Sequence, residues 1–527
     1  MSVKRVDRYD GFLTAICFIT SLLLYVRTLT PGLLPGDSGE FQTLAYLLGH
    51  THPTGYPVYL GLAKLVTFLP LRDVAYRVNL FSALMAASTV AGVYLSGRLL
   101  VNYRVLAFIG AMALAISRTF WSQAVIAEVY TAGSAFLAFL ILTLLWWGQT
   151  DKPLALFLAG MLGGLSLGVH ASVALSAPVV LLFLLLNWRR GTRKWKAALA
   201  GAVTGLTITV ITFGLIDWHD PTANYFNSVI EPSCSAWGLT ADEIDGPLER
   251  LFFGWGARQF RSFMFADITT VMPRRAIEYW QNLPLELGLP LIWLAFLGTA
   301  ILLIRRMRVG LLLILGLAIQ LFSIFNYEIW DLYVLYIPSY VLLSILSIVG
   351  MGTVVDLGVV ALHRIVFLAQ TWWIDLALEG AVGILVLVFA LWPVFQPYQQ
   401  AVIIGEAPFE FDGYPTYDEF TLNISRAMVN KLPENAIVFT DWDMMWPYYY
   451  AAHIIEDRRD LTFIETYPAD DMDGIADSVA TYLADNLDEH PIFFSDRDPG
   501  LLAAGLKFIP ARSGPVRLVR ILDDREE

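Results

Sequence analysis

The chain has 527 residues, of which 57% are hydrophobic and 16% are charged, and its mean hydropathy is +0.58. This balance excludes an ordinary soluble protein, a disordered chain and a collagen-like fibre. Two cysteines are too few for a disulfide scaffold. Because Cys17 lies in an apolar run and Cys234 in a polar loop, we expect them not to pair. The composition therefore predicts a membrane protein.

The net charge of -12 is distributed unevenly along the chain. Residues 1–400 carry 25 Lys/Arg and 22 Asp/Glu, whereas residues 401–527 carry 10 and 25. The first part is a succession of apolar runs, and the second has the composition of a soluble protein. We therefore predict a transmembrane domain over 1–398 and an acidic domain over 399–527.

Apolar runs of the length needed to cross a bilayer, about 20 residues, recur through the first domain. The run 154–186 is too long for one helix, and we divide it near Gly168 and His170. About eleven transmembrane helices are predicted, at 11–28, 76–97, 105–119, 131–147, 154–169, 171–186, 197–216, 287–304, 309–325, 334–355 and 372–393.

Basic residues predict the orientation, because loops on the cytoplasmic side are enriched in Lys and Arg. If the N-terminus is cytoplasmic, the basic cluster 189–196 and the triplet Arg305, Arg306 and Arg308 fall on the same side. The long loops 29–75 and 217–286 and the acidic domain then lie outside. We interpret 1–28 as a retained helix, since no small-residue cleavage site precedes Pro31.

The outer regions have patterns of their own. The first loop contains a helical pattern at 41–48 and an apolar stretch at 56–69 that we expect to lie at the interface or to re-enter the membrane. The second loop is rich in aromatic residues and arginines. An aromatic belt at the membrane interface would also account for many of these aromatic residues. The acidic domain reads as α/β, with helical patterns at 415–431, 444–456 and 473–487. Its predicted strands are 436–442, 461–467, 491–495, 506–510 and 516–522.

The densest group of chemically useful side chains follows the first span. Asp37 and Glu40 begin a helix three positions apart, so they share one face near a helix N-terminus that stabilises negative charge. A capped interfacial helix would explain both equally well. A carboxylate at the mouth of a membrane cavity is also suited to act as a general base. Together with His50 and His52, these acids could form a divalent metal site, although hard cations prefer more carboxylates.

Further ionisable groups fall at the outer ends of predicted spans, where charge is costly unless it reaches water or a polar cavity. Arg77 and Arg118 could bind a phosphate bidentately, or could simply extend toward the interface. Glu128 is also explained as a helix cap, and His170 as a structural histidine. In the acidic domain, Asp441 to Asp443 and the aromatic run 446–450 could bind an acceptor or a sugar, or could belong to the core.

Several of these segments, in order, resemble the transmembrane O-mannosyltransferase family found in bacteria and animals. Each segment is weak evidence alone, and the ordered combination is specific. The resemblance covers most of residues 30–340. The segments are Gly36–Phe41, His52–Pro57, Tyr76–Leu80, Ser117–Trp121, Ala127–Tyr130, Gly168–His170 and Asn326–Pro338.

The resemblance implies a polytopic α-helical membrane protein with a GT-C-like fold and a C-terminal soluble α/β domain. Such an enzyme transfers a sugar, here mannose, from a polyprenyl-phosphate carrier to an exoplasmic acceptor with inversion. Asp37 matches the position of the catalytic base, with Glu40 beside it, and we assign the donor phosphate to Arg77 and Arg118. Residues that we expect to contact substrate or support the site are His52, Tyr56, Glu128, His170, Asp331 and Tyr333.

The expected partners are the lipid-linked donor, a protein or glycan acceptor and the bilayer, with no nucleic acid. We expect no cofactor, with a metal left open, and location in a bacterial inner membrane. A transporter or flippase of a lipid-linked substrate is the main alternative, but it would be expected to show repeats and charges at the membrane midplane. A non-catalytic assembly subunit is a third interpretation.

Overall fold

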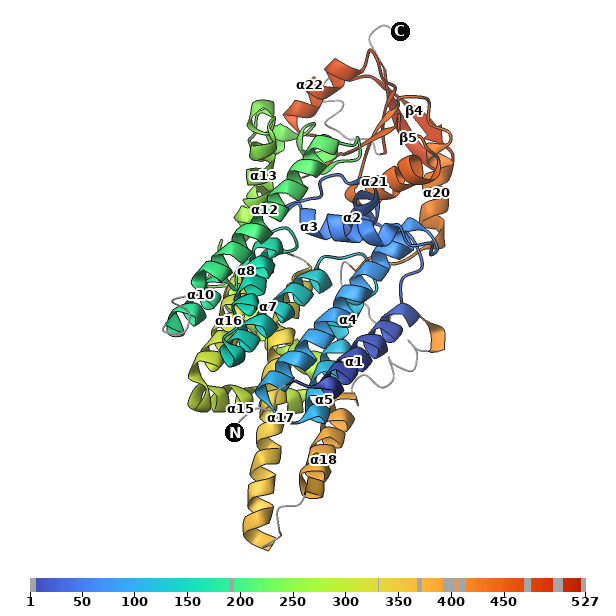
Figure 1. Cartoon of the computed structure of the whole chain (residues 1–527). Coiled ribbons are helices and arrows are strands. Elements are labelled where there is room, and N and C mark those ends of the chain that lie inside the picture. The colour runs from blue at the N-terminus through green and yellow to red at the C-terminus, as the bar shows by residue number, and fades with distance from the viewer. Residues whose placement is uncertain are drawn as a thin grey trace. The chain divides into compact units, whose positions relative to one another are not determined.

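The computed structural model describes residues 6–188, 194–329, 331–366, 372–391, 403–405, 411, 414–468, 475–495 and 506–522. Residues 189–193 of the basic cluster and Trp330 of the segment Asn326–Pro338 lie outside the described residues. Contacts divide the chain into two compact units, which we name the helical unit and the mixed unit (Figure 1). The helical unit comprises 1–29, 80–209 and 262–413, and the mixed unit comprises 30–79, 210–261 and 414–527.

The helical unit is built from apolar helices, two of which, α4 and α12, also have residues in the mixed unit. Each predicted span coincides with one or two helices. They are α1 (Arg8–Arg27), α4 (Val74–Leu100), α5 (Arg104–Ala115), α6 (Arg118–Ala124), α7 (Tyr130–Thr150), α8 (Pro153–Ser166), α9 (Ala171–Ala174), α10 (Ala177–Leu186), α12 (Trp195–His219), α14 (Val271–Leu287), α15 (Leu289–Arg305), α16 (Met307–Phe325), α17 (Ile337–Val366) and α18 (Trp372–Leu391).

Six helices in the described part of the chain are long and apolar enough to cross a bilayer, and the number becomes eight if each of two bent pairs is one span. The pair α5 and α6 bends by 68°, and the pair α14 and α15 by 106°. The three remaining predicted spans, 154–169, 171–186 and 372–393, contain shorter apolar helices, at 153–166, 171–186 and 376–388. The predicted break near His170 is confirmed, since α8 ends at Ser166 and α9 begins at Ala171.

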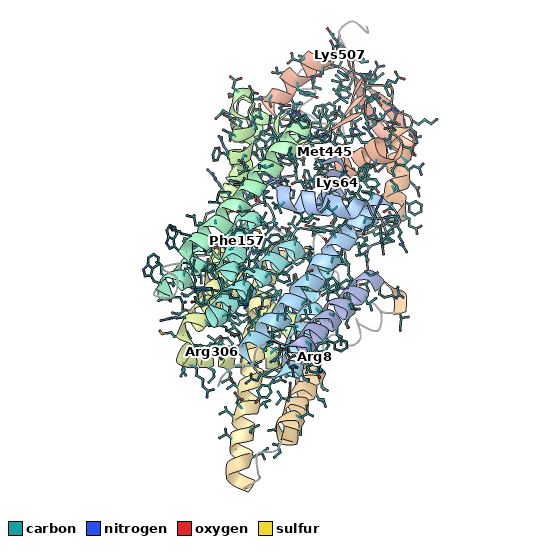
Figure 2. The ribbon with its side chains drawn as sticks, in the orientation of Figure 1. Arg8, Lys64, Phe157, Arg306, Met445 and Lys507 are labelled. Carbon is teal, nitrogen blue, oxygen red and sulfur yellow. The ribbon has the colours of Figure 1, made fainter. Side chains whose placement is uncertain are left out.

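Glycine allows some of these helices to approach backbone to backbone. A Cβ added at Gly160 of α8 would lie 2.0 Å from the carbonyl oxygen of Ala198 on α12. One added at Gly201 of α12 would lie 1.9 Å from the carbonyl oxygen of Phe157, the α8 residue labelled in Figure 2. Small residues spaced four apart are a recurrent device for joining membrane helices. A side chain at Gly160 or Gly201 would therefore force α8 and α12 apart.

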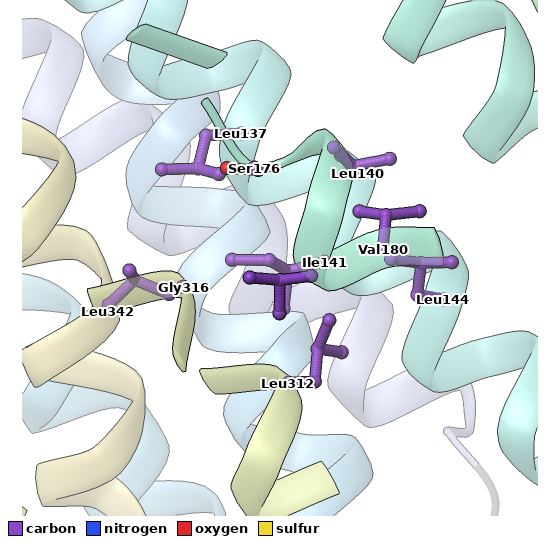
Figure 3. A pocket seen from close by; sticks show the side chains of 10 residues that line it. Leu137, Leu140, Ile141, Leu144, Ser176, Val180, Leu312, Gly316 and Leu342 are labelled. Atoms are coloured by element: carbon purple, nitrogen blue, oxygen red, sulfur yellow. The ribbon is translucent and has the colours of Figure 1, made fainter. Parts of the chain in front are cut away.

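The free space between helices differs within the helical unit. An open pocket of about 310 Å³ is lined by residues of α4, α7 and α8, among them Leu95, Leu142 and Leu158. A cavity of about 20 Å³ lies where α7, α10, α16 and α17 meet, large enough for about one water molecule (Figure 3). Its lining is apolar apart from Ser176. These four helices therefore form a close-packed core.

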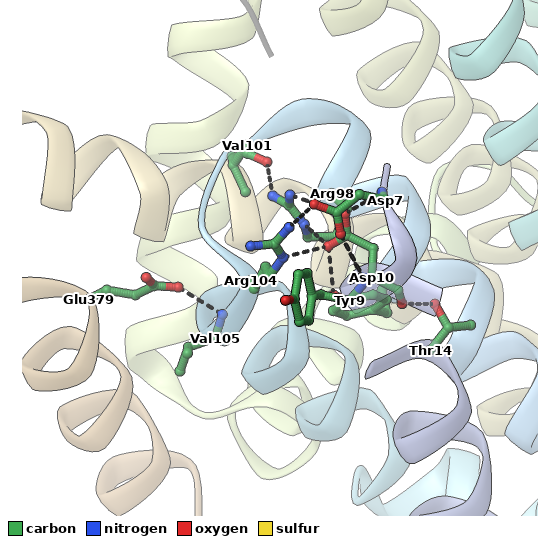
Figure 4. A network of polar contacts seen from close by, with 10 residues as sticks. Asp7, Tyr9, Asp10, Thr14, Arg98, Val101, Arg104, Val105 and Glu379 are labelled. Carbon is green, nitrogen blue, oxygen red and sulfur yellow. Dashed lines mark hydrogen bonds and ion pairs between the residues drawn. The ribbon is translucent and has the colours of Figure 1, made fainter. Parts of the chain in front are cut away.

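A charged network joins the first turn of α1 to α4 and α5 (Figure 4). Asp10 is fully buried, and its Oδ1 accepts hydrogen bonds from Nε of Arg98 at 2.7 Å and from Nε of Arg104 at 3.0 Å. Asp7 caps α1 and pairs with Arg104. Three chain segments are thus held by one buried carboxylate.

The mixed unit contains the first long loop, the second long loop as far as residue 261, and the C-terminal part of the chain. Its first loop forms α2 (Gly36–Leu47) and α3 (Pro57–Thr67), where helical and apolar stretches were predicted. The second loop forms η1 (Phe226–Ile230), η2 (Cys234–Trp237), η3 (Ala241–Glu243), α13 (Pro247–Trp255) and, at its end, η4 (Arg258–Phe263). Whether 399–527 is the exoplasmic domain stays a prediction, because a compact unit carries no information about the side of a membrane.

The C-terminal part has the α/β structure that its sequence predicted. A five-stranded sheet has the order β2-β1-β3-β5-β4, with β1 parallel to β2 and β3, and with β5 antiparallel to β3 and β4. Apolar residues of the strands and of α22 form its core. The elements are α20 (Glu419–Val429), β1 (Ile437–Thr440), α21 (Trp442–Tyr449), η7 (Tyr450–Ile455), β2 (Thr462–Glu465), α22 (Asp477–Asn486), β3 (Ile492–Phe494), β4 (Phe508–Ser513) and β5 (Val516–Ile521).

Candidate active site

The first loop folds back on α2 before that helix begins. The amide side chain of Gln42 accepts a hydrogen bond from the backbone N–H of Leu34 at 2.9 Å and donates one to Asn79 at 2.8 Å. Gly36 opens the helix with a φ of 61°, a conformation that glycine adopts without strain. These contacts place Asp37 in the first turn of α2, where the helix dipole stabilises a carboxylate.

Asp37 is partly exposed and is held by a residue from the far end of the chain. Its Oδ1 accepts a hydrogen bond of 2.7 Å from the indole N–H of Trp442, at the start of α21. No hydrogen bond to Oδ2 is found among the described residues. One oxygen of the carboxylate is therefore anchored, and the other makes no hydrogen bond to the described residues.

Glu40 differs from Asp37 in its surroundings, although both lie on α2. It is fully buried, and its two oxygens contact the backbone N–H of His52 at 2.8 Å and the Nδ1 of His52 at 2.5 Å. Burial raises the pKa of the Glu40 carboxyl, while the neighbouring His52 acts in the opposite direction. Glu40 thus orients the His52 loop instead of facing solvent.

An aromatic cluster surrounds this pair of acids. The ring of Phe41 lies 5.6 Å from that of His52 and 5.7 Å from that of Tyr56. The hydroxyl of Tyr56 donates to the carbonyl of Pro53 at 3.2 Å. The structure therefore brings together Asp37, Glu40, His52 and Tyr56, all of which were predicted to belong to the site.

The second loop contributes residues that sequence reasoning did not assign to the site. Tyr225 is buried, its ring lies 6.1 Å from that of Trp442, and its hydroxyl donates to Gln259 at 2.7 Å. Its backbone N–H donates to the carbonyl of His50 at 2.9 Å. First loop, second loop and C-terminal part thus all reach the surroundings of Asp37.

A charged group fixes the second loop to the first. Asp217 accepts from Arg250 at 2.7 and 3.1 Å, and contacts Nε2 of His50 at 3.1 Å. Burial lowers the pKa of His50, so the imidazole is neutral and donates to Asp217, whose charge is balanced by Arg250. Asp217 and Arg250 thus support His50, whose backbone carbonyl binds the N–H of Tyr225.

Arg77, predicted to bind the donor phosphate, uses part of its guanidinium within the chain. Its Nε donates to the carbonyl of Asp73 at 3.0 Å, and its Nη1 to those of Thr67 and Leu69 at 2.7 and 2.9 Å. The bonds from Nη1 pair with backbone carbonyls at and just beyond the C-terminal end of α3. A phosphate contact by Arg77 stays a prediction and would have to use Nη2.

The other predicted phosphate ligand lies in the helical unit. Arg118 begins α6, with its guanidinium 4.5 Å from the ring centre of Phe411. Tyr333 stacks on Phe411 at 4.5 Å with nearly parallel rings, at 6°. Sequence reasoning missed Phe411. Asp331, two positions before Tyr333, starts the 3₁₀ helix η5 (Leu332–Tyr336) without a side-chain cap.

Glu128 and His170 also lie in the helical unit. Glu128 is buried, and its backbone N–H and C=O both hydrogen-bond Ser82. His170 caps α9 through Ser172, and its ring lies 5.3 Å from that of Tyr130. The structural interpretation of His170 has this direct support. Contact of Glu128 or His170 with a substrate stays a prediction.

In the described residues, no group of three or more His, Cys, Asp or Glu side chains is arranged to hold a metal ion. Asp37, Glu40, His50 and His52 do not form the metal cluster that was left open. His52 is instead paired with Glu40, and His50 with Asp217. The dependence of activity on a metal is a separate question for experiment.

Comparison with solved structures defines the class of fold. ArnT from Cupriavidus metallidurans, solved bound to undecaprenyl phosphate, matches with a TM-score of 0.58 at 14% identity, over 97% of this chain and 98% of that chain. The oligosaccharyltransferase of Archaeoglobus fulgidus matches with a TM-score of 0.53 at 12% identity, over 92% and 70%. The predicted GT-C-like fold is confirmed, and the chain is an integral membrane protein.

Comparison of sequences confirms the predicted family resemblance. Residues 37–195 match the family model described as the N-terminal domain of protein O-mannosyl-transferase TMEM260. The mouse protein of that name is 34% identical over 125 residues, which are 24% of this chain and 18% of the mouse protein. The Dictyostelium discoideum protein is 26% identical over 135 residues, which are 25% of this chain and 16% of that protein. The chain thus aligns with less than a fifth of these relatives' length.

Proposed function

We propose that this chain is a membrane glycosyltransferase that moves a sugar from a polyprenyl-phosphate carrier to a hydroxyl of a Ser or Thr side chain. Mannose is the proposed sugar, because the relatives that match residues 37–195 are named protein O-mannosyl-transferases. A lipid-phosphate donor is consistent with the ArnT structure, which was solved with undecaprenyl phosphate. We place the reaction on the exoplasmic side of a bacterial inner membrane, with the N-terminus in the cytoplasm.

The observation that carries this proposal is the position of Asp37. Its carboxylate lies partly exposed in the first turn of α2 with one oxygen held by Trp442, while its neighbour Glu40 is buried and bound to His52. A general base needs an accessible, oriented oxygen, and Asp37 alone of this pair has one. We therefore assign Asp37 as the base and Glu40 with His52 as its support.

The proposed reaction is a single displacement with inversion. Asp37 takes the proton of the acceptor hydroxyl while that oxygen forms a bond to the anomeric carbon of the sugar. The bond from this carbon to the phosphate oxygen breaks, and the polyprenyl phosphate leaves with the electron pair. Arg77 or Arg118 would stabilise the negative charge that develops on the phosphate.

The test is to replace Asp37 by Asn and to assay the full chain in nanodiscs with polyprenyl-phosphate mannose and a Ser/Thr-rich peptide. The amide cannot take the proton, so the turnover number should fall by a factor of about 100 to 10,000. Asp443→Asn is the matched control, because Asp443 is an exposed acid close to the start of α2. Its Oδ1 lies 3.2 Å from the position that a Cβ on Gly36 would take. That variant should keep most of its activity.

Retained turnover by a folded Asp37→Asn variant would contradict the assignment of the base. Wild-type protein that transfers no sugar from any polyprenyl-phosphate donor would contradict the proposed function itself. Assays with and without a chelator test whether transfer depends on a metal, which the sequence leaves open.

A further inference from the structure

We propose that Trp442 is a positioning residue for Asp37, holding Oδ1 so that Oδ2 takes the proton of the acceptor hydroxyl. This inference rests on the proposed function and adds to it a residue outside the segment matched by the family model, which ends at residue 195. Its basis is the hydrogen bond of 2.7 Å from the indole Nε1 to Asp37 Oδ1. Indole nitrogen is only a donor, so the bond favours the ionised carboxylate.

Trp442 is fixed on the side of the C-terminal sheet. It lies two residues beyond the end of β1, and Asp441 caps the helix it begins by accepting from the backbone N–H of Met444 at 3.0 Å. The Trp442 ring meets Trp446 edge-on at 5.5 Å. Within 441–450, Trp442 thus lies beside Asp37, whereas Trp446 and the tyrosines 448–450 are buried in the core.

The helix that carries Trp442 is also fixed against the helix that carries Asp37. The hydroxyl of Thr43 on α2 donates to the carbonyl of Trp446 on α21 at 3.2 Å. A Cβ built at Gly39 would lie 3.4 Å from Cδ of Pro447. The indole ring itself also lies 6.1 Å from each of the rings of His52 and Tyr225. The indole is therefore flanked by three rings, which restrict its movement relative to Asp37.

The charged side chains that interact with Asp37 are negative in two cases, Glu40 on the same helix and Asp443 on α21. His52 is engaged by Glu40. The indole N–H is thus a favourable dipole on a carboxylate that these neighbours repel. Loss of that N–H should free the carboxylate to rotate.

Trp442→Phe removes the donor and keeps an aromatic ring. Trp147→Phe makes the same chemical change at a buried tryptophan of α7 whose Nε1 has no hydrogen-bond partner among the described residues. We expect Trp442→Phe to lower kcat about 10- to 100-fold, with the KM for the donor changed less than twofold. Trp147→Phe should keep the wild-type kcat and KM.

A second replacement covers the case in which Trp442→Phe does not fold. 3-Benzothienylalanine at position 442 replaces the N–H by sulfur with little change of shape, and it should give the same loss of kcat at nearly unchanged KM. A purely structural tryptophan would lower the amount of active protein without lowering kcat per folded molecule. If either variant, when folded, matches Trp147→Phe in kcat, the inference is wrong, whereas an inactive wild type would refute the proposed function instead.

Discussion

Replacing Asp10 by Asn should lower the free energy of unfolding by more than its position in the first turn of a helix would indicate. Asp10 is fully buried, and Arg98, which it binds, is only 1% exposed. Tyr94 also donates to Asp10 Oδ1, at 3.2 Å. The amide keeps the shape of the carboxylate but leaves the guanidinium of Arg98 buried without a balancing charge. The carbonyl of Val101, 2.6 Å from Nη1, cannot replace that charge.

The expected size of the effect follows from the burial of each partner. Removing one partner of a buried ion pair typically costs about 3 to 5 kcal/mol of unfolding free energy, and we expect this range for Asp10→Asn. Arg104 is 36% exposed, so Arg104→Gln should cost about 1 kcal/mol or less. Replacing the pair by Asp10→Leu with Arg98→Met should cost less than Asp10→Asn alone, because no buried charge then remains.

These values can be measured by denaturant or thermal unfolding of the detergent-solubilised chain, followed by tryptophan fluorescence. Wild type, Asp10→Asn, Arg104→Gln, the double variant and its two single variants, Asp10→Leu and Arg98→Met, are compared in one detergent at one pH. A cost of Asp10→Asn within about 1 kcal/mol of Arg104→Gln would refute the reasoning. So would a double replacement that costs as much as its two single replacements together, because independent sites show such additivity.

Two further predictions concern packing and pH. Gly160→Ala should lower the free energy of unfolding by about 1 to 3 kcal/mol through the clash with α12. Gly163→Ala on the same helix should be neutral or stabilising, because a Cβ there meets nothing within 4 Å. Equal unfolding midpoints of the two variants would contradict this prediction. Because burial lowers the pKa of His50 from its ordinary value of 6.5, the unfolded state binds a proton below pH 6.5 that the folded state does not. Stability should therefore fall on acidification below pH 6.5, and less steeply in His50→Gln, as thermal unfolding at pH 7.5 and 5.5 would measure; parallel pH dependences would contradict the burial argument.

Periodicity predicted most of the secondary structure, because each helix or strand is a local pattern. All five strands of the C-terminal sheet and the three helical patterns between them lie within a few residues of their predicted positions. The break near His170 was likewise predictable from two small local signals. What periodicity could not predict is helix geometry, such as the 68° bend at residues 116–117. That bend depends on packing against distant residues.

The candidate site was predictable only in its first-loop half. Asp37, Glu40, His52 and Tyr56 lie within twenty residues, so their motif could be read along the chain. Trp442 is 405 positions from Asp37, and Asp217 is 167 positions from His50. No local pattern pairs residues at such separations. The run 441–450 was noticed for its aromatic residues, but only the fold distinguishes Trp442, beside the carboxylate, from Trp446 in the core.

The mixed unit is assembled from three stretches of chain, of which the last begins at residue 414. During synthesis at about 5 to 20 residues per second, Trp442 is made about 20 to 80 s after Asp37. The ribosome has therefore delivered all the apolar helices of the described residues, the last of which ends at Leu391, before the carboxylate acquires its hydrogen-bond donor. On the proposed function, a nascent chain that has not reached residue 442 would sit in the bilayer with an unoriented base and would transfer sugar more slowly than the chain that contains Trp442.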